Sequence, residues 1–471
     1  MDPFLLAGAR ETADATIPVL DKHRGTLLAE VARADAGHFD RALRAADGAR
    51  SAMASLRPDE RAGVLEQARS RLGERRDALV ELLVAEGGKP VRAARVEVDR
   101  TLATFAVSAR EALAAADEPV SLGDASGQAR GYAARVRRVP IGVAGFITPF
   151  NFPLNLVAHK VAPAVAAGCP FVLKPASSTP LSALAIGEAL LDAGLPEGAF
   201  SVLPARGPVA EVLGTDDRVR KLSFTGSDAV GWRLAQLAWR KRVTLELGGN
   251  AAVVVDGTAD LDDAAARITN AAFGQAGQSC ISVQRIVATA DVADALRERL
   301  VERAREVRAG DPRDEETLVG PMINEREAER VLAWVDEAVA GGATVLAGGE
   351  RDGAVVQATL LEGAAPGSRV LDDEVFGPVA TLVRVPDFEA ALREVNRSRY
   401  GLQAGVFTAD RSRAARAFDV LEVGGVVIGD VPTWRAEAMP YGGVKDSGVG
   451  REGPRYAIEA LTEPRLLVER T

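Results

Sequence analysis

The feature that most constrains the fold is a regular alternation of short apolar strands with helical segments, which begins near residue 131. This β-α-β alternation predicts an open parallel sheet flanked by helices. Strands of this first set are expected at 141–147, 170–175, 200–204, 220–226 and 243–249.

A second alternating set follows and predicts a second α/β domain of the same kind. The residues before both sets, 38–117, read as helices: Pro58 opens one helix, which ends at Gly87 and Gly88. Strands of the second set are expected at 252–256, 284–289, 378–384, 404–408 and 424–428.

The segment 461–470, L-T-E-P-R-L-L-V-E-R, reads as a late strand with no hairpin partner beside it in sequence. An earlier alternating stretch, 131–139, also lacks a neighbour. We expect the two to form a small sheet together, or the late strand to extend the sheet edge of a neighbouring subunit.

Charge and rare residue types exclude several classes of function. The net charge of −9 argues against nucleic acid as the main partner, since phosphate binding requires excess Lys and Arg. With two cysteines far apart and three histidines, the chain has no Cys-x-x-Cys or His-Glu-x-x-His pattern, so no metal site is predicted. We find neither a signal peptide nor an apolar run of membrane length, and therefore expect a cytoplasmic protein without membrane contact.

Polar residues stand at the carboxyl ends of three predicted strands, where ligands bind in open α/β sheets. Asn151 follows the first strand, Lys174 ends the second, and Glu246 lies at the end of strand 243–247. Each alone can be a turn asparagine, a solvated lysine or a paired buried glutamate. Their common position favours a functional interpretation.

Two glycine motifs differ in their context. Gly226–Gly231 follows a predicted strand and opens a helix, so its backbone N–H groups can bind phosphate, although an ordinary strand-to-helix turn fits equally. Gly448–Gly453 matches G-x-G-x-x-G but has no strand before it and little chain after it. We interpret it as a glycine-rich turn.

Cys280 lies in F-G-Q-A-G-Q-S-C-I-S-V-Q-R, between glycines and a strand-like run. A partly ionised thiol is a good nucleophile, whereas a lone cysteine is also commonly a buried apolar residue. Ser279 is not a hydrolase nucleophile, because Gly-x-Ser-x-Gly fails at Ile281.

Seven ordered segments together resemble the NAD(P)-dependent aldehyde dehydrogenase superfamily, over nearly the whole chain. The likeness is greatest to the subgroup around lactaldehyde, phosphonoacetaldehyde and non-phosphorylating glyceraldehyde-3-phosphate dehydrogenases. The segments are T-P-F-N-F-P-L-N (148–155), V-L-K-P-A-S (172–177), F-T-G-S-D-A-V-G (224–231), L-E-L-G-G-N (245–250), G-Q-S-C (277–280), E-V-F-G-P-V (374–379) and P-Y-G-G-V-K-D-S-G-V-G-R-E-G (440–453).

The resemblance implies an α/β, aldehyde dehydrogenase-like fold: two open parallel-sheet domains and a small β oligomerisation hairpin. The cofactor-binding domain would comprise 1–120 and 140–248, and the catalytic domain 249–440. The oligomerisation strands would lie in 121–139 and 455–471, in a homodimer or homotetramer.

It also implies the oxidation of a small aldehyde to its carboxylic acid. Cys280 would attack the aldehyde to give a thiohemiacetal, hydride would pass to NAD(P)+, and Glu246 would activate the water that hydrolyses the resulting thioester. The Asn151 amide and the Cys280 backbone N–H would hold the oxyanion. The cofactor residues implied by the motifs are Thr148, Pro149, Phe150, Lys174, Ser177, Gly226, Ser227, Gly231, Leu247, Glu374 and Phe376.

Two features of specificity follow from the comparison with the family pattern. NAD-preferring members often carry an acid at the position of Ser177, so we expect NADP to be accepted here, with a slight preference over NAD. The pocket would be lined by Phe152, Ser279, Ile281 and Trp434. Arg100, Arg285 and Arg435 can each be anion donors or structural residues, and the polarity of the aldehyde stays open.

Three rival functions make different demands on the site. A CoA-acylating dehydrogenase would share Cys280, but the hydrolytic base Glu246 would waste its thioester. A non-catalytic binding or structural relative should have lost Cys280, Glu246 or Asn151. A cysteine amidohydrolase would need a histidine near the thiol.

Overall fold

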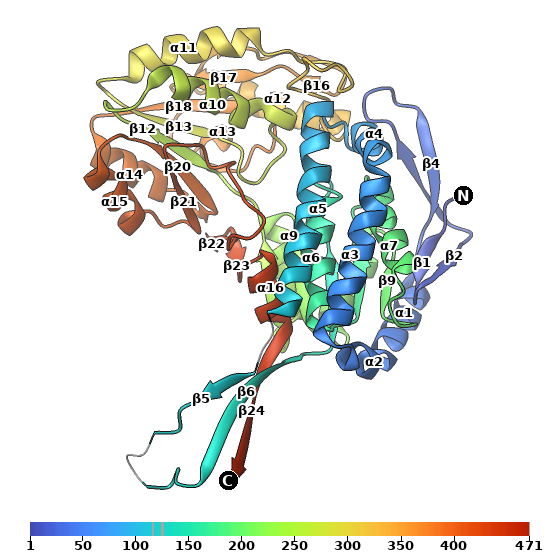
Figure 1. Cartoon of the computed structure of the whole chain (residues 1–471). Helices are drawn as coiled ribbons and strands as arrows, with labels where there is room; N and C mark the ends of the chain where they lie inside the picture. The colour runs from blue at the N-terminus through green and yellow to red at the C-terminus, as the bar shows by residue number, and fades with distance from the viewer. Residues whose placement is uncertain (115–116, 124–126, 471) are drawn as a thin grey trace.

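The computed structural model describes residues 1–114, 117–123 and 127–470. The remaining residues fall within the predicted ranges 1–120, 121–139 and 455–471 and lie outside the described part of the chain. The described chain forms two α/β bodies and a projecting three-stranded sheet (Figure 1).

The first sheet has the order β2-β1-β9-β8-β7-β10-β11-β23. Its five central strands are parallel and confirm the strands predicted for the first set. Antiparallel strands close both edges, and β23 brings a carboxyl-terminal segment against β11. The bounds are β1 Phe4–Leu6, β2 Ala9–Glu11, β7 Val143–Ile147, β8 Phe171–Lys174, β9 Phe200–Val202, β10 Val219–Thr225, β11 Arg242–Glu246 and β23 Gly448–Val449.

The second sheet has the order β14-β17-β18-β13-β12-β20-β21 and is parallel except at β14. Every strand predicted for the second set is present. The bounds are β12 Ala252–Val255, β13 Arg285–Thr289, β14 Thr344–Ala347, β17 Thr359–Glu362, β18 Val379–Val385, β20 Gln403–Phe407 and β21 Gly425–Ile428.

Helices cover the sheets and bury apolar residues against them. In the first body α3, α5 and α6 lie side by side (Figure 1). Every residue of α6 is buried, which makes this helix part of the core. The helices of the first body are α1 Ala36–Gly48, α2 Arg50–Ser55, α3 Pro58–Glu74, α4 Arg76–Gly87, α5 Val91–Leu113, α6 Asn155–Ala167, α7 Pro180–Asp192, α8 Val212–Thr215, α9 Asp228–Leu237 and α16 Pro454–Leu461.

The single helix predicted from Pro58 to Gly87 is wrong, because the chain leaves the helical conformation at Arg75. The break follows Gly73, a poor helix former, while the apolar pattern stays helical on both sides. The strands before α1 were not predicted either.

The other elements are β3 Thr16–Leu20, β4 Leu27–Ala32, β15 Arg351–Asp352, β16 Val355–Val356, β19 Tyr400–Gly401, β22 Val444–Lys445, α10 Leu261–Phe273, α11 Ala293–Glu306, α12 Glu325–Ala340, α13 Arg369–Asp372, α14 Phe388–Asn396 and α15 Arg411–Val420.

The projecting sheet has the order β24-β6-β5, with β5 at Glu118–Val120, β6 at Tyr132–Pro140 and β24 at Thr462–Arg470. β24 pairs antiparallel with β6 along its whole length, which confirms the predicted pairing of the late strand with 131–139. The sheet extends away from both bodies (Figure 1).

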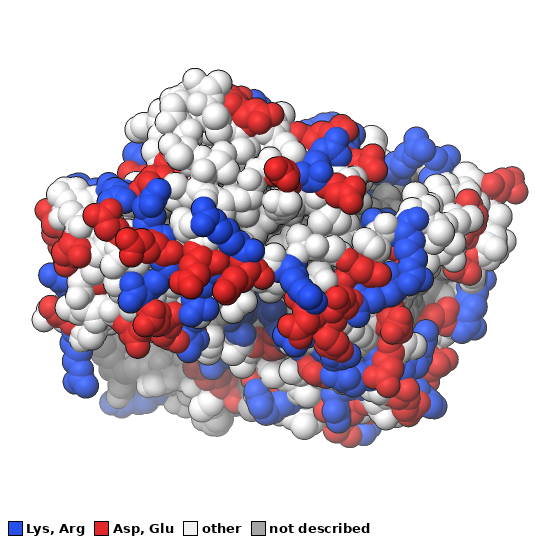
Figure 2. All heavy atoms as spheres, turned by 90° about the horizontal axis from the view of Figure 1, so that it is seen from above, with Lys and Arg blue, Asp and Glu red and all other residues white. Residues whose placement is uncertain are grey.

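Acidic and basic side chains are interspersed on the face of the molecule seen in Figure 2. Among the described residues, no helix combines the length and the apolar character needed to cross a membrane. The division into domains stays a prediction.

Candidate active site

A strained turn sets the position of Cys280. After α10, Gln275, Ala276 and Gly277 take successive left-handed conformations, which non-glycine residues adopt only where the surroundings hold them. Gly277 is required there, since a Cβ would lie 2.0 Å from the Gly377 carbonyl oxygen. Gly249 is equally constrained, because its Cβ would lie 2.1 Å from the Cys280 carbonyl oxygen.

The turn delivers Cys280 to a cavity of about 1220 Å³. Asn151 and Glu246 line the same cavity, so the structure brings together all three predicted catalytic residues. They come from the loop after β7, the end of β11 and the loop after α10. The cavity therefore lies at the carboxyl ends of the parallel strands.

Glu246 is a buried carboxyl group without a hydrogen-bond partner for either side-chain oxygen among the described residues. Burial raises the pKa of Glu246 well above its ordinary value, and the nearby charge of Glu452 adds to the effect. A carboxylate with a raised pKa is a stronger base than an ordinary carboxylate, which favours the role of general base.

The pKa of the neighbouring Glu452 is shifted in the opposite direction. Burial acts to raise its pKa, but the charges of Lys160, His159 and Arg435 outweigh that effect and keep the pKa of Glu452 below its usual range. Lys160 Nζ lies 2.7 Å from Glu452 Oε1 and 2.8 Å from Ser223 Oγ. The pKa values of the two carboxyl groups are thus shifted in opposite directions, because only Glu452 has a cationic partner in contact.

Asn151 is fixed by its contacts with the Cys280 loop. Its Nδ2 donates to the Gln278 carbonyl oxygen at 3.0 Å, and Gln275 Nε2 donates to the Asn151 carbonyl oxygen. One N–H of the amide remains for a ligand. The amide is therefore pre-oriented beside the thiol, as an oxyanion donor must be.

The thiol of Cys280 contacts a residue that the sequence reasoning missed. Cys280 Sγ lies 3.1 Å from the hydroxyl of Tyr441, which is buried in the same cavity. Burial raises the pKa of the Cys280 thiol to about 12, and the hydrogen bond with Tyr441 opposes that rise. The other cysteine, Cys169, is buried in the first core and donates to the Leu461 carbonyl oxygen.

Most of the predicted cofactor residues line the cavity, and four lie just outside its lining: Thr148, Lys174, Ser177 and Gly231. Gly231 packs against the Leu247 side chain, where a Cβ would meet Leu247 at 2.3 Å. Ser177 Oγ donates to the Ala205 carbonyl oxygen at 2.9 Å. Those that line the cavity are Pro149, Phe150, Gly226, Ser227, Leu247, Glu374 and Phe376.

Several buried polar groups here lack protein partners and fit a dinucleotide. Burial lowers the pKa of Lys174 to about 8, and its ammonium makes no ion pair with the described residues. The hydroxyls of Thr148 and Thr225 are also buried without partners in this part of the chain. Glu374 accepts from the Gly249 N–H at 2.8 Å, and burial raises the pKa of its carboxyl group to about 7. Ribose hydroxyls and phosphates are the groups that such residues bind.

Of the predicted pocket residues, Phe152, Ser279 and Ile281 line the cavity. Trp434 does not line it: its side chain is half-exposed, and the neighbouring Thr433 and Arg435 line the cavity at this turn. The pocket wall near the thiol is therefore more polar than an indole would make it.

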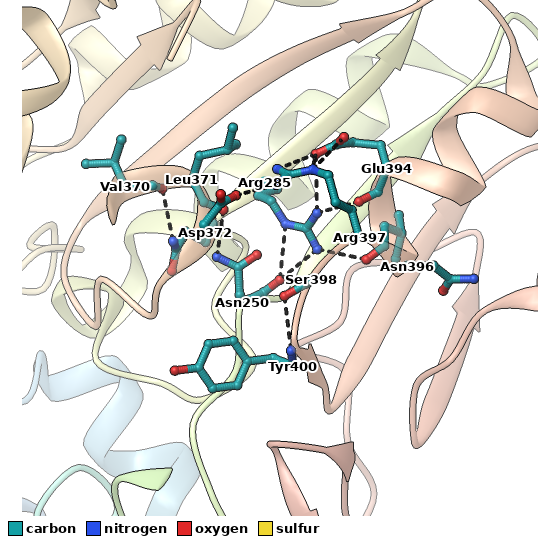
Figure 3. A network of polar contacts seen from close by, with 12 residues as sticks. Asn250, Arg285, Val370, Leu371, Asp372, Glu394, Asn396, Arg397, Ser398 and Tyr400 are labelled. Carbon is teal, nitrogen blue, oxygen red and sulfur yellow. Dashed lines mark hydrogen bonds and ion pairs between the residues drawn. The ribbon is translucent and has the colours of Figure 1, made fainter. Parts of the chain in front are cut away.

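The three candidate arginines have different environments. Arg285 is a structural residue: its guanidinium donates to the carbonyl oxygens of Glu394, Val395 and Asn250 (Figure 3). Arg100 and Arg435, in contrast, both line the cavity.

Comparison with known proteins agrees with this geometry. A model of the aldehyde dehydrogenase family matches residues 9–467. The chain belongs to the aldehyde dehydrogenase family. This aldehyde dehydrogenase oxidises aldehydes to carboxylic acids with NAD(P), in the manner of the family.

Its relatives include proteins of known structure and of assigned substrate. A 3-sulfolactaldehyde dehydrogenase of Priestia megaterium is 42% identical over 98% of this chain and 96% of its own. The structure of aldehyde dehydrogenase 21 from Physcomitrella patens, in complex with the reaction product succinate, is 42% identical with a TM-score of 0.97, over 99% of this chain and 98% of that one.

A third relative carries a cofactor. The glyceraldehyde-3-phosphate dehydrogenase GapN from Methanocaldococcus jannaschii, complexed with NADP, is 33% identical with a TM-score of 0.93 and covers 98% of this chain and 100% of its own. NADP-complexed relatives of this kind support NADP use by the aldehyde dehydrogenase described here.

Proposed function

We propose that this aldehyde dehydrogenase oxidises a small anionic aldehyde, with Cys280 as nucleophile, Glu246 as base and Asn151 as oxyanion donor. The observation that carries the proposal is one cavity that holds these three residues together with the guanidinium groups of Arg100 and Arg435.

The residues divide the chemistry among them. The Cys280 thiolate attacks the aldehyde carbon, and the Asn151 amide with the Cys280 backbone N–H stabilises the oxyanion. A nicotinamide cofactor held in this cavity would supply the acceptor for the hydride that leaves this carbon. Glu246 then removes a proton from the water that hydrolyses the thioester, and its raised pKa suits that step.

Arg435 is a buried cation whose guanidinium group is only partly paired: its Nη2 lies 3.3 Å from His159 Nε2 and near one carboxylate. The nearest carboxylate oxygen, Glu452 Oε2, is 4.0 Å from its Nη2, and Glu452 is already paired with Lys160. The Arg435 Nε is buried without a partner among the described residues. Leaving a buried N–H group without a partner is unfavourable, so an anionic substrate group that accepts from this N–H would complete the site.

Arg100 is also positioned to bind an anionic substrate group. Its Nε donates to the carboxylate of Glu437, which also pairs with His159, and these contacts fix the guanidinium plane. The two Nη atoms of Arg100 donate to no residue in the described ranges. Planar guanidinium groups bind carboxylate, sulfonate and phosphate well.

The relatives support an anionic substrate. Sulfolactaldehyde carries a sulfonate, and the aldehyde that yields succinate carries a carboxylate. A glyceraldehyde-3-phosphate dehydrogenase acts on a phosphate ester. These anions share their charge and differ in shape, so we propose the charge and leave the individual compound open.

Arg100→Met tests the substrate class. We expect KM for succinic semialdehyde to rise about 10- to 100-fold, because a charge-assisted hydrogen bond is lost, with little change for the neutral aldehyde propanal. Steady-state kinetics with both aldehydes measure the effect. Arg44→Met is the matched control, since the Arg44 side chain is exposed on α1, and it should change neither KM. Equal losses with the two aldehydes would refute an anion-binding role.

Ser177→Glu tests the cofactor preference, which we propose to favour NADP slightly. A carboxylate after β8 would repel a 2′-phosphate and accept a hydrogen bond from a 2′-hydroxyl. We expect KM for NADP to rise at least about 10-fold while KM for NAD does not increase. Ser55→Glu, on the exposed end of α2, is the control. A wild-type enzyme with a strong preference for NAD would contradict the proposal.

Product analysis distinguishes thioester hydrolysis from the rival CoA-acylating reaction. With succinic semialdehyde and NADP, we expect the free acid as product whether CoA is present or absent. Formation of an acyl-CoA would replace hydrolysis with transfer, and Glu246 would then need another role.

We propose a homodimer or homotetramer on the basis of exposed apolar surface. On the projecting β24, Leu466 is 57% exposed and Val468 is 46% exposed. On α9, Val230 is 48% exposed. Such residues are typical of subunit contacts. Light scattering of the purified chain distinguishes monomer, dimer and tetramer. A cytoplasmic location stays a prediction.

A further inference from the structure

We propose that Tyr441 is a catalytic residue: its phenolic hydroxyl donates a hydrogen bond to the Cys280 sulfur and stabilises the thiolate. The proposal deepens the proposed function, since it assumes Cys280 as the nucleophile. It assigns to Tyr441 a role that the glycine-rich sequence motif around it does not indicate.

The geometry supports a direct contact with the reacting atom. The hydroxyl oxygen of Tyr441 lies 3.1 Å from Cys280 Sγ, and both residues line the cavity. Cys280, Met439 and Tyr441 pack with Ile281 and Leu402 in one small apolar cluster. Tyr441 itself is buried while Cys280 is partly exposed to the cavity, so the hydroxyl meets the sulfur at the boundary between the apolar cluster and the cavity.

The direction of the hydrogen bond follows from the ionisation of the two groups. Burial raises the pKa of Tyr441 well above its ordinary value, so the phenol keeps its proton throughout the working pH range. A thiolate has no proton to donate. Tyr441 is therefore the donor and the sulfur the acceptor whenever Cys280 is ionised.

Arg435 strengthens this donor. Its guanidinium carbon lies 3.7 Å from the centre of the Tyr441 ring, in cation–π contact. A cation over the ring withdraws electron density from the phenol and makes its O–H more acidic. The Arg435 charge also favours the Cys280 thiolate directly and opposes the carboxylates of Glu374 and Glu246, which disfavour it.

Sulfur carries negative charge twice in the proposed reaction. It is a thiolate before it attacks the aldehyde, and it leaves as a thiolate when water has added to the thioester. Between these points the sulfur is covalently bound and neutral. Tyr441 stabilises the charged sulfur at both points, and no proton passes between the two groups.

Tyr441→Phe tests the proposal, because it removes one oxygen and keeps the ring against Arg435. The measurement is the rate of Cys280 alkylation by iodoacetamide as a function of pH. We expect its midpoint to move up by about one pH unit. At pH 7, kcat/KM for aldehyde oxidation should fall about 10-fold, with the loss shrinking as the pH approaches the higher midpoint.

Tyr132→Phe is the matched control, since Tyr132 lies on the exposed β6 and should leave the alkylation profile unchanged. If Tyr441→Phe does not fold, site-specific 3-fluorotyrosine at residue 441 replaces it. The more acidic phenol should then move the alkylation midpoint down.

The possible outcomes distinguish the role of Tyr441 from the proposed function of Cys280 on which it rests. A Tyr441→Phe profile superimposable on the wild type, or an unmoved fluorotyrosine profile, would overturn the role of Tyr441 while leaving Cys280 as nucleophile. Full activity after complete alkylation of Cys280 would overturn the proposed function itself.

Discussion

Replacing Cys280 by alanine is expected to abolish aldehyde oxidation, with kcat lowered by at least about 10⁴-fold, as for other enzymes that lose a covalent nucleophile. Asn151, Glu246 and the arginines would remain in place, but none of them can form the covalent bond to the aldehyde carbon. Absorbance of the reduced nicotinamide measures the loss. Cofactor binding should persist, because the cavity residues expected to hold the dinucleotide, such as Ser227 and Glu374, are separate from Cys280.

Cys169→Ala is the control for Cys280→Ala. Cys169 is fully buried in the first core and does not line the cavity, and burial raises the pKa of its thiol to about 11. We expect this variant to lose some thermal stability and to keep its turnover per folded enzyme. If Cys169→Ala were inactive while Cys280→Ala stayed active, the assignment of the nucleophile would be reversed.

Replacing Glu246 by glutamine is expected to stop the cycle after hydride transfer. The amide is nearly isosteric with the carboxyl group but cannot accept a proton from water, so the thioester on Cys280 should accumulate. We expect a burst of reduced nicotinamide close to one equivalent per subunit, followed by turnover slowed about 10²- to 10⁴-fold.

Intact mass spectrometry reads out the intermediate directly, as an added acyl mass on Glu246→Gln that is absent from the double variant with Cys280→Ala. Glu188→Gln is the control, since Glu188 forms an exposed pair with Arg10 and neither residue lines the cavity. Wild-type turnover by Glu246→Gln would show that another group activates the water.

The same variant should change the pH dependence of stability. The folded pKa of Glu246 is raised, so between its unfolded and folded pKa values the folded state binds more protons than the unfolded state. Folding stability contributed by this site therefore falls as pH rises through that window. Glu246→Gln removes the penalty, so its Tm should exceed the wild-type Tm at pH 8 and approach it at pH 4.

Much of the fold was predictable because it depends on local patterns. Strands such as β7 and β12 are short apolar runs between helical segments, and their alternation determines a parallel sheet. The edge strands β1 and β2 depend on the pairing of β1 with the distant β9, which the local apolar pattern does not indicate. The pairing of β24 with β6 could be predicted because the late strand has no hairpin partner beside it in sequence, whereas the pairing of β6 with β5 was not predicted.

The candidate site was predictable where a residue type is rare or stands at a strand end. Cys280 and Glu246 met those conditions. Tyr441 did not, because a tyrosine in a glycine-rich turn carries no signal of what its hydroxyl will contact. Arg435 and Trp434 are neighbours in sequence, and only the path of the turn decides that the arginine faces the cavity while the indole is half-exposed.

The late segment that carries Arg435, Tyr441 and Glu452 reaches the cavity by joining β23 to the edge of the first sheet at β11. Synthesis proceeds from the amino terminus, so the ribosome makes Cys280 long before the groups that tune its thiol. Until that segment docks, a nascent chain holds a cysteine of ordinary reactivity beside an unfinished sheet edge. The environment that sets the reactivity of the Cys280 thiol therefore forms late in biogenesis. Labelling of stalled nascent chains should detect this step as an abrupt change in the reactivity of the thiol.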